Sequence, residues 1–145
     1  MRSLALYFTG PRQVDVREET LADPAYGQVL VQTLFSAISP GTESLIYRGQ
    51  APQGLAVDET ISALAGEFTF PLKYGYSVVG RVAALGHGVA PEWLGKLVFA
   101  FHPHESHFLA TPDELLCLPA DVSPEDAVFF PNMETAVSLL LDGQP

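Results

Sequence analysis

The chain has 145 residues, of which 48% are hydrophobic and 17% charged, so it can bury the core of one domain and is neither a disordered tail nor a coiled coil. Seven Lys and Arg against seventeen Asp and Glu give a net charge of −10, which argues against nucleic acid as a partner. The single cysteine, Cys117, excludes an internal disulfide and an all-cysteine metal cluster. Its apolar neighbours predict a buried, inert thiol.

The apolar run near the start, residues 4–8, is too short for a membrane span or a signal-peptide core. We therefore expect a soluble cytoplasmic protein without a membrane partner.

Short apolar or alternating runs separated by Gly and Pro predict a β-rich domain of the barrel or sandwich kind. The expected strands are residues 3–8, 13–19, 28–35, 76–85, 96–101, 106–110 and 114–118. Residues 38–54 have the composition of a loop, with at most a helical turn at 42–47, and Asp58 is placed to cap a short helix over 58–64.

The C-terminal part has helical signals instead. Ser123 is a candidate N-cap with Pro124 at the first helical position. Pro131 is expected to break that segment, and a second helix is predicted over 132–141 with Gly143 as its C-cap.

Residues 70–89 (FPLKYGYSVVGRVAALGHGV) are the most informative segment, because Gly75 opens an apolar strand and Gly80 lies inside it, where another backbone can approach closely. Two further blocks frame this segment, residues 27–43 before it and residues 118–136 after it. Together the ordered blocks resemble the N-terminal GroES-like catalytic domain of the medium-chain dehydrogenase/reductases, the zinc-type alcohol dehydrogenase-like superfamily. The resemblance covers almost the whole chain and implies a mainly β, partly open GroES-like barrel with short C-terminal helices.

In that family the last helix leads into a Rossmann domain that binds the dinucleotide. We assign residues 1–131 to the GroES-like domain and 132–145 to the connecting helix, since no strand followed by Gly-x-Gly-x-x-Gly is present. The parent protein is expected to be roughly twice this length. This chain alone should then neither bind the dinucleotide tightly nor turn over, although a naturally short, free-standing domain is an alternative.

Zinc-dependent relatives hold the catalytic metal through a Cys, a His and a third ligand, and the matching positions here are Pro40, Tyr76 and Pro131. Proline has no side-chain ligand and a phenol is a poor zinc donor. Glu134 could ligate but lies three residues past the matching position. The resemblance therefore implies an enzyme that works without zinc.

Three residues are candidates for catalysis. Thr42 matches the hydroxyl residue that passes on the substrate proton, or it only stabilises a turn. The adjacent Glu43 matches an acidic residue that supports the metal site; without the metal it bridges loops or faces solvent. Tyr76 should point into the active cleft, where it could donate a proton to a substrate carbonyl or only fill the space that zinc leaves. Of the clustered His102, His104 and His107, His102 is the preferred substrate contact or acid/base, with a pKa near ~6.5 that suits either state.

The histidine cluster with Glu105 also permits a relocated metal site, although a surface histidine loop is more common. Thr135 and Ala136 match small residues that line the cofactor cleft near the nicotinamide, or they are ordinary helix positions.

These residues predict the substrate-side domain of a zinc-independent, NAD(P)(H)-dependent oxidoreductase that acts on a small-molecule carbonyl, quinone or activated double bond. Its own Rossmann domain would be its partner. The alternatives are a zinc alcohol dehydrogenase with a relocated metal and a non-catalytic GroES-like module, whose 132–142 helix would be covered by homo-oligomerisation. Residues 39–43 also resemble a subgroup containing bacteriochlorophyllide dehydrogenase-like proteins, which identifies no substrate.

Overall fold

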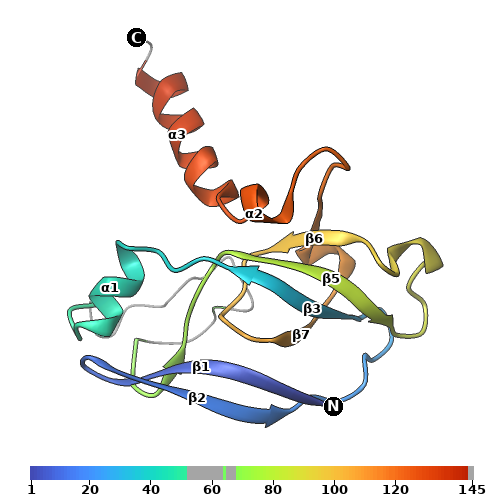
Figure 1. Cartoon of the computed structure of the whole chain (residues 1–145), viewed down its shortest axis with the longest axis horizontal. Coiled ribbons are helices and arrows are strands. Elements are labelled where there is room, and N and C mark those ends of the chain that lie inside the picture. The colour runs from blue at the N-terminus through green and yellow to red at the C-terminus, as the bar shows by residue number, and fades with distance from the viewer. Residues whose placement is uncertain (52–63, 65–67, 144–145) are drawn as a thin grey trace.

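The computed structural model describes residues 1–51, 64, 68–143, so nearly all of the helix predicted over 58–64 lies outside the described residues. Two antiparallel sheets form the body, and the C-terminal helix projects from it (Figure 1). The arrangement is a partly open barrel, as the sequence predicted.

The smaller sheet has the order β2-β1-β4. It consists of β1 (Arg2–Gly10), β2 (Gln13–Thr20) and β4 (Leu72–Lys73). β1 lies in the middle and buries Ala5 and Phe8, whereas Val14 and Val16 on the outer strand are exposed. The alternation in β2 therefore predicted the strand correctly, but Val14 and Val16 stay exposed because, among the residues described, β2 is an edge strand of its sheet.

The larger sheet has the order β7-β3-β5-β6-β8. Its strands are β3 (Val29–Ser36), β5 (Val78–Leu85), β6 (Leu97–Ala100), β7 (His107–Ala110) and β8 (Leu116–Cys117). Buried valines of the three middle strands fill its core with Phe108. The prediction of a buried Cys117 is wrong, because β8 is a two-residue edge strand that leaves the thiol exposed.

Gly80 permits the close contact between β3 and β5. A Cβ at this position would lie 2.5 Å from Val31 Cγ1 and 2.6 Å from the Gln32 carbonyl oxygen. The two sheets meet where the chain segment before β7 runs along β1, with the Leu6 amide donating to the His104 carbonyl at 2.9 Å. These contacts join the sheets at one side without closing the barrel.

The helices are α1 (Thr42–Tyr47), α2 (Pro124–Ala127) and α3 (Phe130–Gly143), with single 3₁₀ turns at Pro91–Trp93 and Pro112–Glu114. The Ser123 hydroxyl accepts from the Asp126 amide at 3.1 Å, which confirms the predicted N-cap of α2.

The predicted break at Pro131 is wrong. This proline lies in the first turn of α3, where the missing N–H needs no helical partner. Gly143 lies inside the same helix, so its expected role as a C-cap is also wrong.

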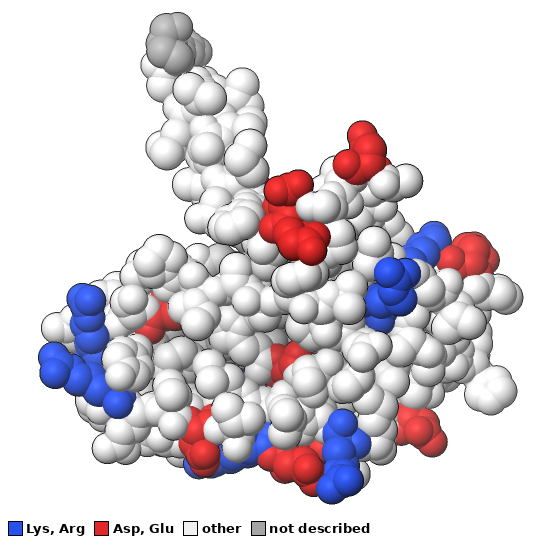
Figure 2. All heavy atoms as spheres, viewed as in Figure 1, with Lys and Arg blue, Asp and Glu red and all other residues white. Residues whose placement is uncertain are grey.

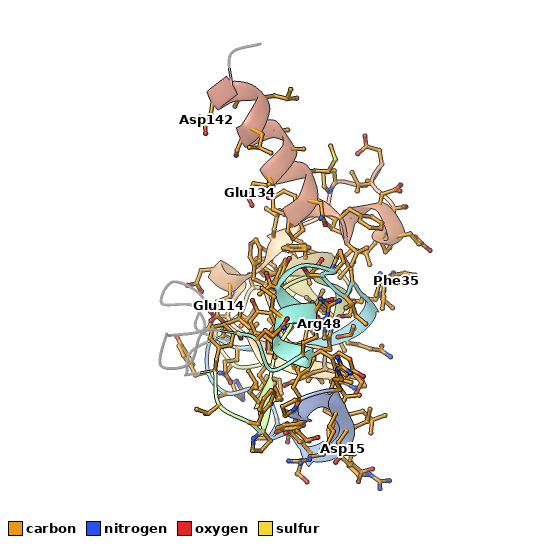
Figure 3. The ribbon with its side chains drawn as sticks, turned by 90° about the vertical axis from the view of Figure 1, so that its left-hand side faces the viewer. Asp15, Phe35, Arg48, Glu114, Glu134 and Asp142 are labelled. Carbon is orange, nitrogen blue, oxygen red and sulfur yellow. The ribbon has the colours of Figure 1, made fainter. Side chains whose placement is uncertain are left out.

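α3 stands clear of the sheets, as Figure 3 shows from the side with Glu134 and Asp142 on it. None of its residues is buried. Figure 2 shows that the face of this helix in view carries no charged side chain. Its exposed large apolar residues are Phe130, Met133, Val137, Leu139, Leu140 and Leu141. Within the part of the chain that the structure describes, no helix has the length and apolar character needed to cross a bilayer.

Candidate functional site

A hydrogen-bonded cluster joins three segments that are far apart in the sequence. His104, on the connection between β6 and β7, donates from Nε2 to Glu43 Oε2 of α1 at 2.7 Å. Its other ring nitrogen, Nδ1, is hydrogen-bonded to Ser36 Oγ at the end of β3. The fold thus joins a hydroxyl, an imidazole and a carboxylate in one hydrogen-bonded series.

The carboxylate of this cluster is deeply buried. Glu43 is 2% exposed, and its second oxygen, Oε1, accepts from the Ser39 amide at 2.8 Å. A buried carboxylate needs such partners, because an unpaired one would lose its hydration without compensation. Of the alternatives for Glu43, the structure shows the one in which it bridges loops.

Gly75 makes room for the imidazole. Its φ of 141° lies in the region that favours glycine, and a Cβ there would be 2.9 Å from both Cδ2 and Nε2 of His104. Gly75, in the most informative segment of the sequence, therefore lets the backbone pack directly against the ring of His104.

Thr42 and Tyr76 are sequence neighbours of two residues in contact with this cluster, Glu43 and Gly75. Thr42 begins α1 directly before Glu43 and is exposed. Tyr76 directly follows Gly75, is half-buried, and meets the ring of Tyr74 edge-on at 6.2 Å between centroids. Two of the three predicted catalytic residues are thus sequence neighbours of residues that touch His104.

His102 occupies a different environment. Its ring stacks on Phe108 with 3.9 Å between centroids, and Nδ1 lies 3.2 Å from the Pro103 carbonyl oxygen. Burial lowers the pKa of His102 to about 4, so the ring is neutral near pH 7. The expected pKa near ~6.5 is therefore wrong for this residue.

The other members of the histidine cluster are also separated. Glu105 is paired with Lys73 at 2.5 Å, and His107 Nδ1 lies 3.2 Å from Ser106 Oγ. Among the residues described, no group of three or more His, Cys, Asp or Glu side chains could hold a metal ion. The three histidines have different partners: His102 stacks on Phe108, His104 binds Glu43 and Ser36, and His107 lies beside Ser106.

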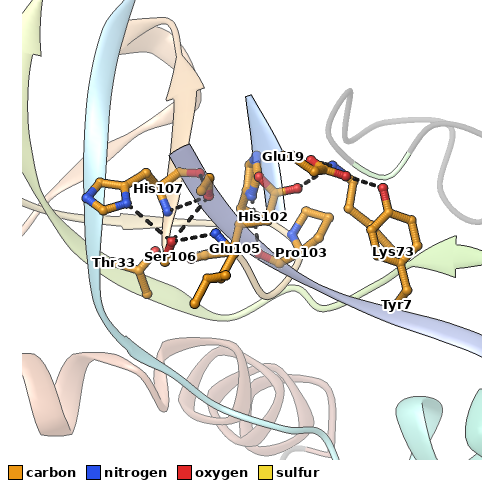
Figure 4. A network of polar contacts seen from close by, with 11 residues as sticks. Tyr7, Glu19, Thr33, Lys73, His102, Pro103, Glu105, Ser106 and His107 are labelled. Carbon is orange, nitrogen blue, oxygen red and sulfur yellow. Dashed lines mark hydrogen bonds and ion pairs between the residues drawn. The ribbon is translucent and has the colours of Figure 1, made fainter. Parts of the chain in front are cut away.

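A second polar network ties β1, β2 and β4 to the segment before β7 (Figure 4). Lys73 contacts Glu19 at 3.1 Å as well as Glu105, and the Tyr7 hydroxyl donates to Glu19. Burial works to lower the pKa of Lys73, but the hydrogen bonds and charges of the two carboxylates outweigh it and raise the pKa. Burial raises the pKa of Glu105, which is 7% exposed, while Lys73 opposes this shift.

The predicted cofactor-side residues lie on α3. Thr135 and Ala136 are both exposed, and the Thr135 hydroxyl donates to the Pro131 carbonyl at 2.9 Å. Both residues lie in the first half of α3, the helix that projects from the body (Figure 1).

An apolar hollow of about 440 Å³ lies next to α1. Its described lining includes Ile46, Phe68, Phe70 and Leu72. A hollow of this size and lining is typical of sites for small apolar ligands, and it begins on the helix that carries Thr42 and Glu43.

The sequence did not predict that Ser36 and Glu43 are hydrogen-bonded to His104. Ser36 is separated from His104 by 68 positions, and Glu43 by 61. A periodicity or motif carries no signal of such a contact; only the fold brings these segments together.

The chain was compared with protein families, curated proteins and solved structures. No family model matches the chain. It is 30% identical over 129 residues to 2-desacetyl-2-hydroxyethyl bacteriochlorophyllide A dehydrogenase of Cereibacter sphaeroides, a match that covers 89% of this chain and 33% of that protein. The chain therefore spans about a third of the length of the curated relative it matches.

Solved structures share the fold. A short chain alcohol dehydrogenase from E. coli CFT073, complexed with NADH, aligns with a TM-score of 0.74 at 19% identity and covers 99% of this chain and 46% of that one. The quinone oxidoreductase from Coxiella burnetii aligns with a TM-score of 0.72 at 19% identity over the same shares. At these identities the likeness concerns the fold.

Proposed function

We propose that this chain, which belongs to the medium-chain dehydrogenase/reductase superfamily, is the substrate-side domain of an NAD(P)(H)-dependent oxidoreductase that works without zinc. The observation that carries the proposal is the match to a dehydrogenase over 89% of the chain. Residues 1–131 would form the catalytic domain and 132–145 the helix toward a Rossmann domain. We place the enzyme in the cytoplasm as part of the same proposal.

The exposed helix α3 supports a missing cofactor domain. Six large apolar side chains on this helix are exposed, and a surface of this kind is usually covered in a working protein. The small side chains of Thr135 and Ala136 leave the helix accessible to a flat ring such as nicotinamide. When bound, the cofactor supplies or accepts the hydride; every other task falls to the protein.

The protein's own task is to meet the charge that develops on the substrate oxygen. Pro40 and Tyr76 stand where the family's zinc ligands stand, so hydrogen-bond donors would replace the metal. We assign this role to the hydroxyls of Thr42 and Tyr76, and to His102 a contact with the substrate as a neutral ring. This favours reduction of quinones, enones or other activated carbonyls.

The test is an assay of the full-length protein with NADH and NADPH against quinones and enones, together with aromatic alcohols that carry a hydroxyethyl group for the opposite direction. Tyr76→Phe should lower kcat/KM by about 10²-fold, the usual contribution of one positioned hydrogen-bond donor to a developing oxyanion. Tyr26→Phe, which removes an exposed phenol on the turn before β3, is the matched control and should leave it unchanged. Stoichiometric zinc that is required for activity, measured by elemental analysis, would contradict the proposal.

The exposed face of α3 also favours a second candidate, a non-catalytic module that self-associates through this helix. Light scattering coupled to size exclusion separates the two. Dimers of the full-length protein that dissociate when Leu140 is replaced by Asp, together with no nicotinamide turnover, would favour the module.

A further inference from the structure

We propose that Ser36, His104 and Glu43 form a proton relay that delivers a proton to the substrate oxygen through the exposed Ser36 hydroxyl. The inference rests on the proposed function, because a carbonyl that receives a hydride at carbon must receive a proton at oxygen. It adds two residues to the site and assigns Glu43 a role that does not involve a metal.

The hydrogen bonds of the cluster admit one arrangement of protons when the ring is neutral. Glu43 accepts from the Ser39 amide and, as a carboxylate, has no proton to give, so His104 must carry its proton on Nε2. Nδ1 is then an acceptor and the Ser36 hydroxyl must donate to it. The same logic orients the imidazole between a carboxylate and a serine in hydrolytic triads.

A proton added to His104 changes what Ser36 can do. With both ring nitrogens protonated, Nδ1–H donates to Ser36 Oγ, and the hydroxyl proton is free to point at a ligand. In the reductive direction the Ser36 O–H bond breaks as the product O–H bond forms, and the proton on Nδ1 passes to Ser36 Oγ. The hydride from the nicotinamide reduces the carbonyl carbon, the nicotinamide is oxidised, and His104 ends neutral.

The exposure of the three groups increases from the carboxylate to the serine, as a relay to an outside molecule requires. Glu43 is 2% exposed, the His104 side chain is 10% exposed, and Ser36 is exposed. The buried carboxylate remains beside the ring in both states and stabilises the imidazolium. The exposed hydroxyl is the end at which an outside molecule can exchange the proton.

Ser36 also emerges beside the predicted site. The next residue, Ala37, donates its amide to the Ser77 carbonyl at 3.0 Å, and Ser77 directly follows Tyr76. Ser36 itself pairs with Val78 in the β3–β5 ladder. The hydroxyl of the relay therefore lies at the same end of the sheet as Tyr76 and the start of α1.

A second serine–histidine contact in the chain provides a comparison. Ser106 Oγ lies 3.2 Å from His107 Nδ1, but the same hydroxyl accepts the Leu4 amide at 2.8 Å and joins β1 to β7. The Ser106 hydroxyl therefore helps to hold the two sheets together. Ser106→Ala is thus a control for loss of a serine hydroxyl from a histidine.

The experiment combines two measurements on the full-length protein. Nitrogen-15 NMR of labelled histidines, without cofactor, should find His104 as the Nε2–H tautomer, and Glu43→Gln should abolish this preference. In steady-state assays Ser36→Ala should lower kcat by about 10²-fold with little change in KM, and Ser36→Thr should recover most of it. Ser106→Ala should leave kcat unchanged, and Ser36→Ala should melt at the wild-type temperature because Ser36 is exposed.

The outcomes separate the relay from the wider proposal. Wild-type turnover with an unchanged kcat in Ser36→Ala would overturn the relay and leave the oxidoreductase proposal intact, as would an Nδ1–H tautomer of His104. A loss of kcat that follows a loss of thermal stability in both serine variants would also overturn it. Absence of any nicotinamide-dependent turnover in the wild type would overturn both.

Discussion

Replacement of Gly75 by alanine tests whether the backbone at this position is what holds His104 against Glu43. The new Cβ would lie 2.9 Å from two atoms of the imidazole, closer than side chains approach without a shift. The ring must therefore move, and the hydrogen bond of 2.7 Å between His104 and Glu43 must lengthen or break. Glu43 would be left with one partner in a buried position.

The cost has two parts. A non-glycine residue at a φ of 141° costs about 1–3 kcal/mol of backbone strain. Loss of a hydrogen bond to a buried charged group costs about 1.5–3 kcal/mol more. We therefore expect Gly75→Ala to lower the free energy of unfolding by about 2.5–6 kcal/mol.

The measurement is urea unfolding followed by the fluorescence of Trp93, the chain's one tryptophan. Gly95→Ala is the matched control, because Gly95 also has a positive φ, 81°, but nothing lies within 4 Å of the added Cβ. It should show the backbone part alone, about 1–2 kcal/mol. If Gly75→Ala costs no more than Gly95→Ala, the imidazole is not confined by this glycine and the reasoning fails.

Three further predictions concern the charged and capping residues. Lys73→Met should lower the free energy of unfolding by about 2 kcal/mol at pH 7, because the buried Glu105 loses its cation. The folded pKa of Glu105 is raised, so this carboxyl stabilises the fold only where it is protonated, and the loss should shrink toward pH 5. A loss independent of pH would contradict this. His102 should lower the free energy of unfolding by about 3 kcal/mol between pH 6.5 and pH 4, because its pKa of about 4 in the folded protein means that the unfolded chain takes up the proton first. His102→Leu should remove this part of the pH dependence, and an unaltered profile would refute it. Ser123→Ala should cost about 1 kcal/mol by removing the N-cap of α2, whereas Ser44→Ala inside α1 should cost nothing measurable, as denaturant titrations would show.

Local chemistry explains which expectations were confirmed. Ser123 and Pro124 start α2 through a side-chain cap that lies within three residues, and Gly80 marks a close strand contact because only glycine leaves the room. The wrong expectations depended on neighbours far along the chain. Cys117 has apolar residues beside it in sequence, yet β8 is an edge strand and the thiol is exposed.

The histidines show the same division. The sequence clusters His102 and His104, but one ring stacks on Phe108 and the other binds Glu43. No local pattern distinguishes a histidine that meets a carboxylate from one that meets an aromatic ring.

The amino-acid sequence by itself determined the β-rich domain, the approximate places of its longer strands along the chain and the capped start of α2, because each depends on residue types within a few positions of one another. The tertiary structure alone decided that Ser36, Glu43 and His104 meet, and that Gly75 is the residue that leaves room for them. Contacts across 61 and 68 positions arise from the packing of two sheets, which short-range propensities do not encode. The proton relay proposed for this domain depends on those contacts.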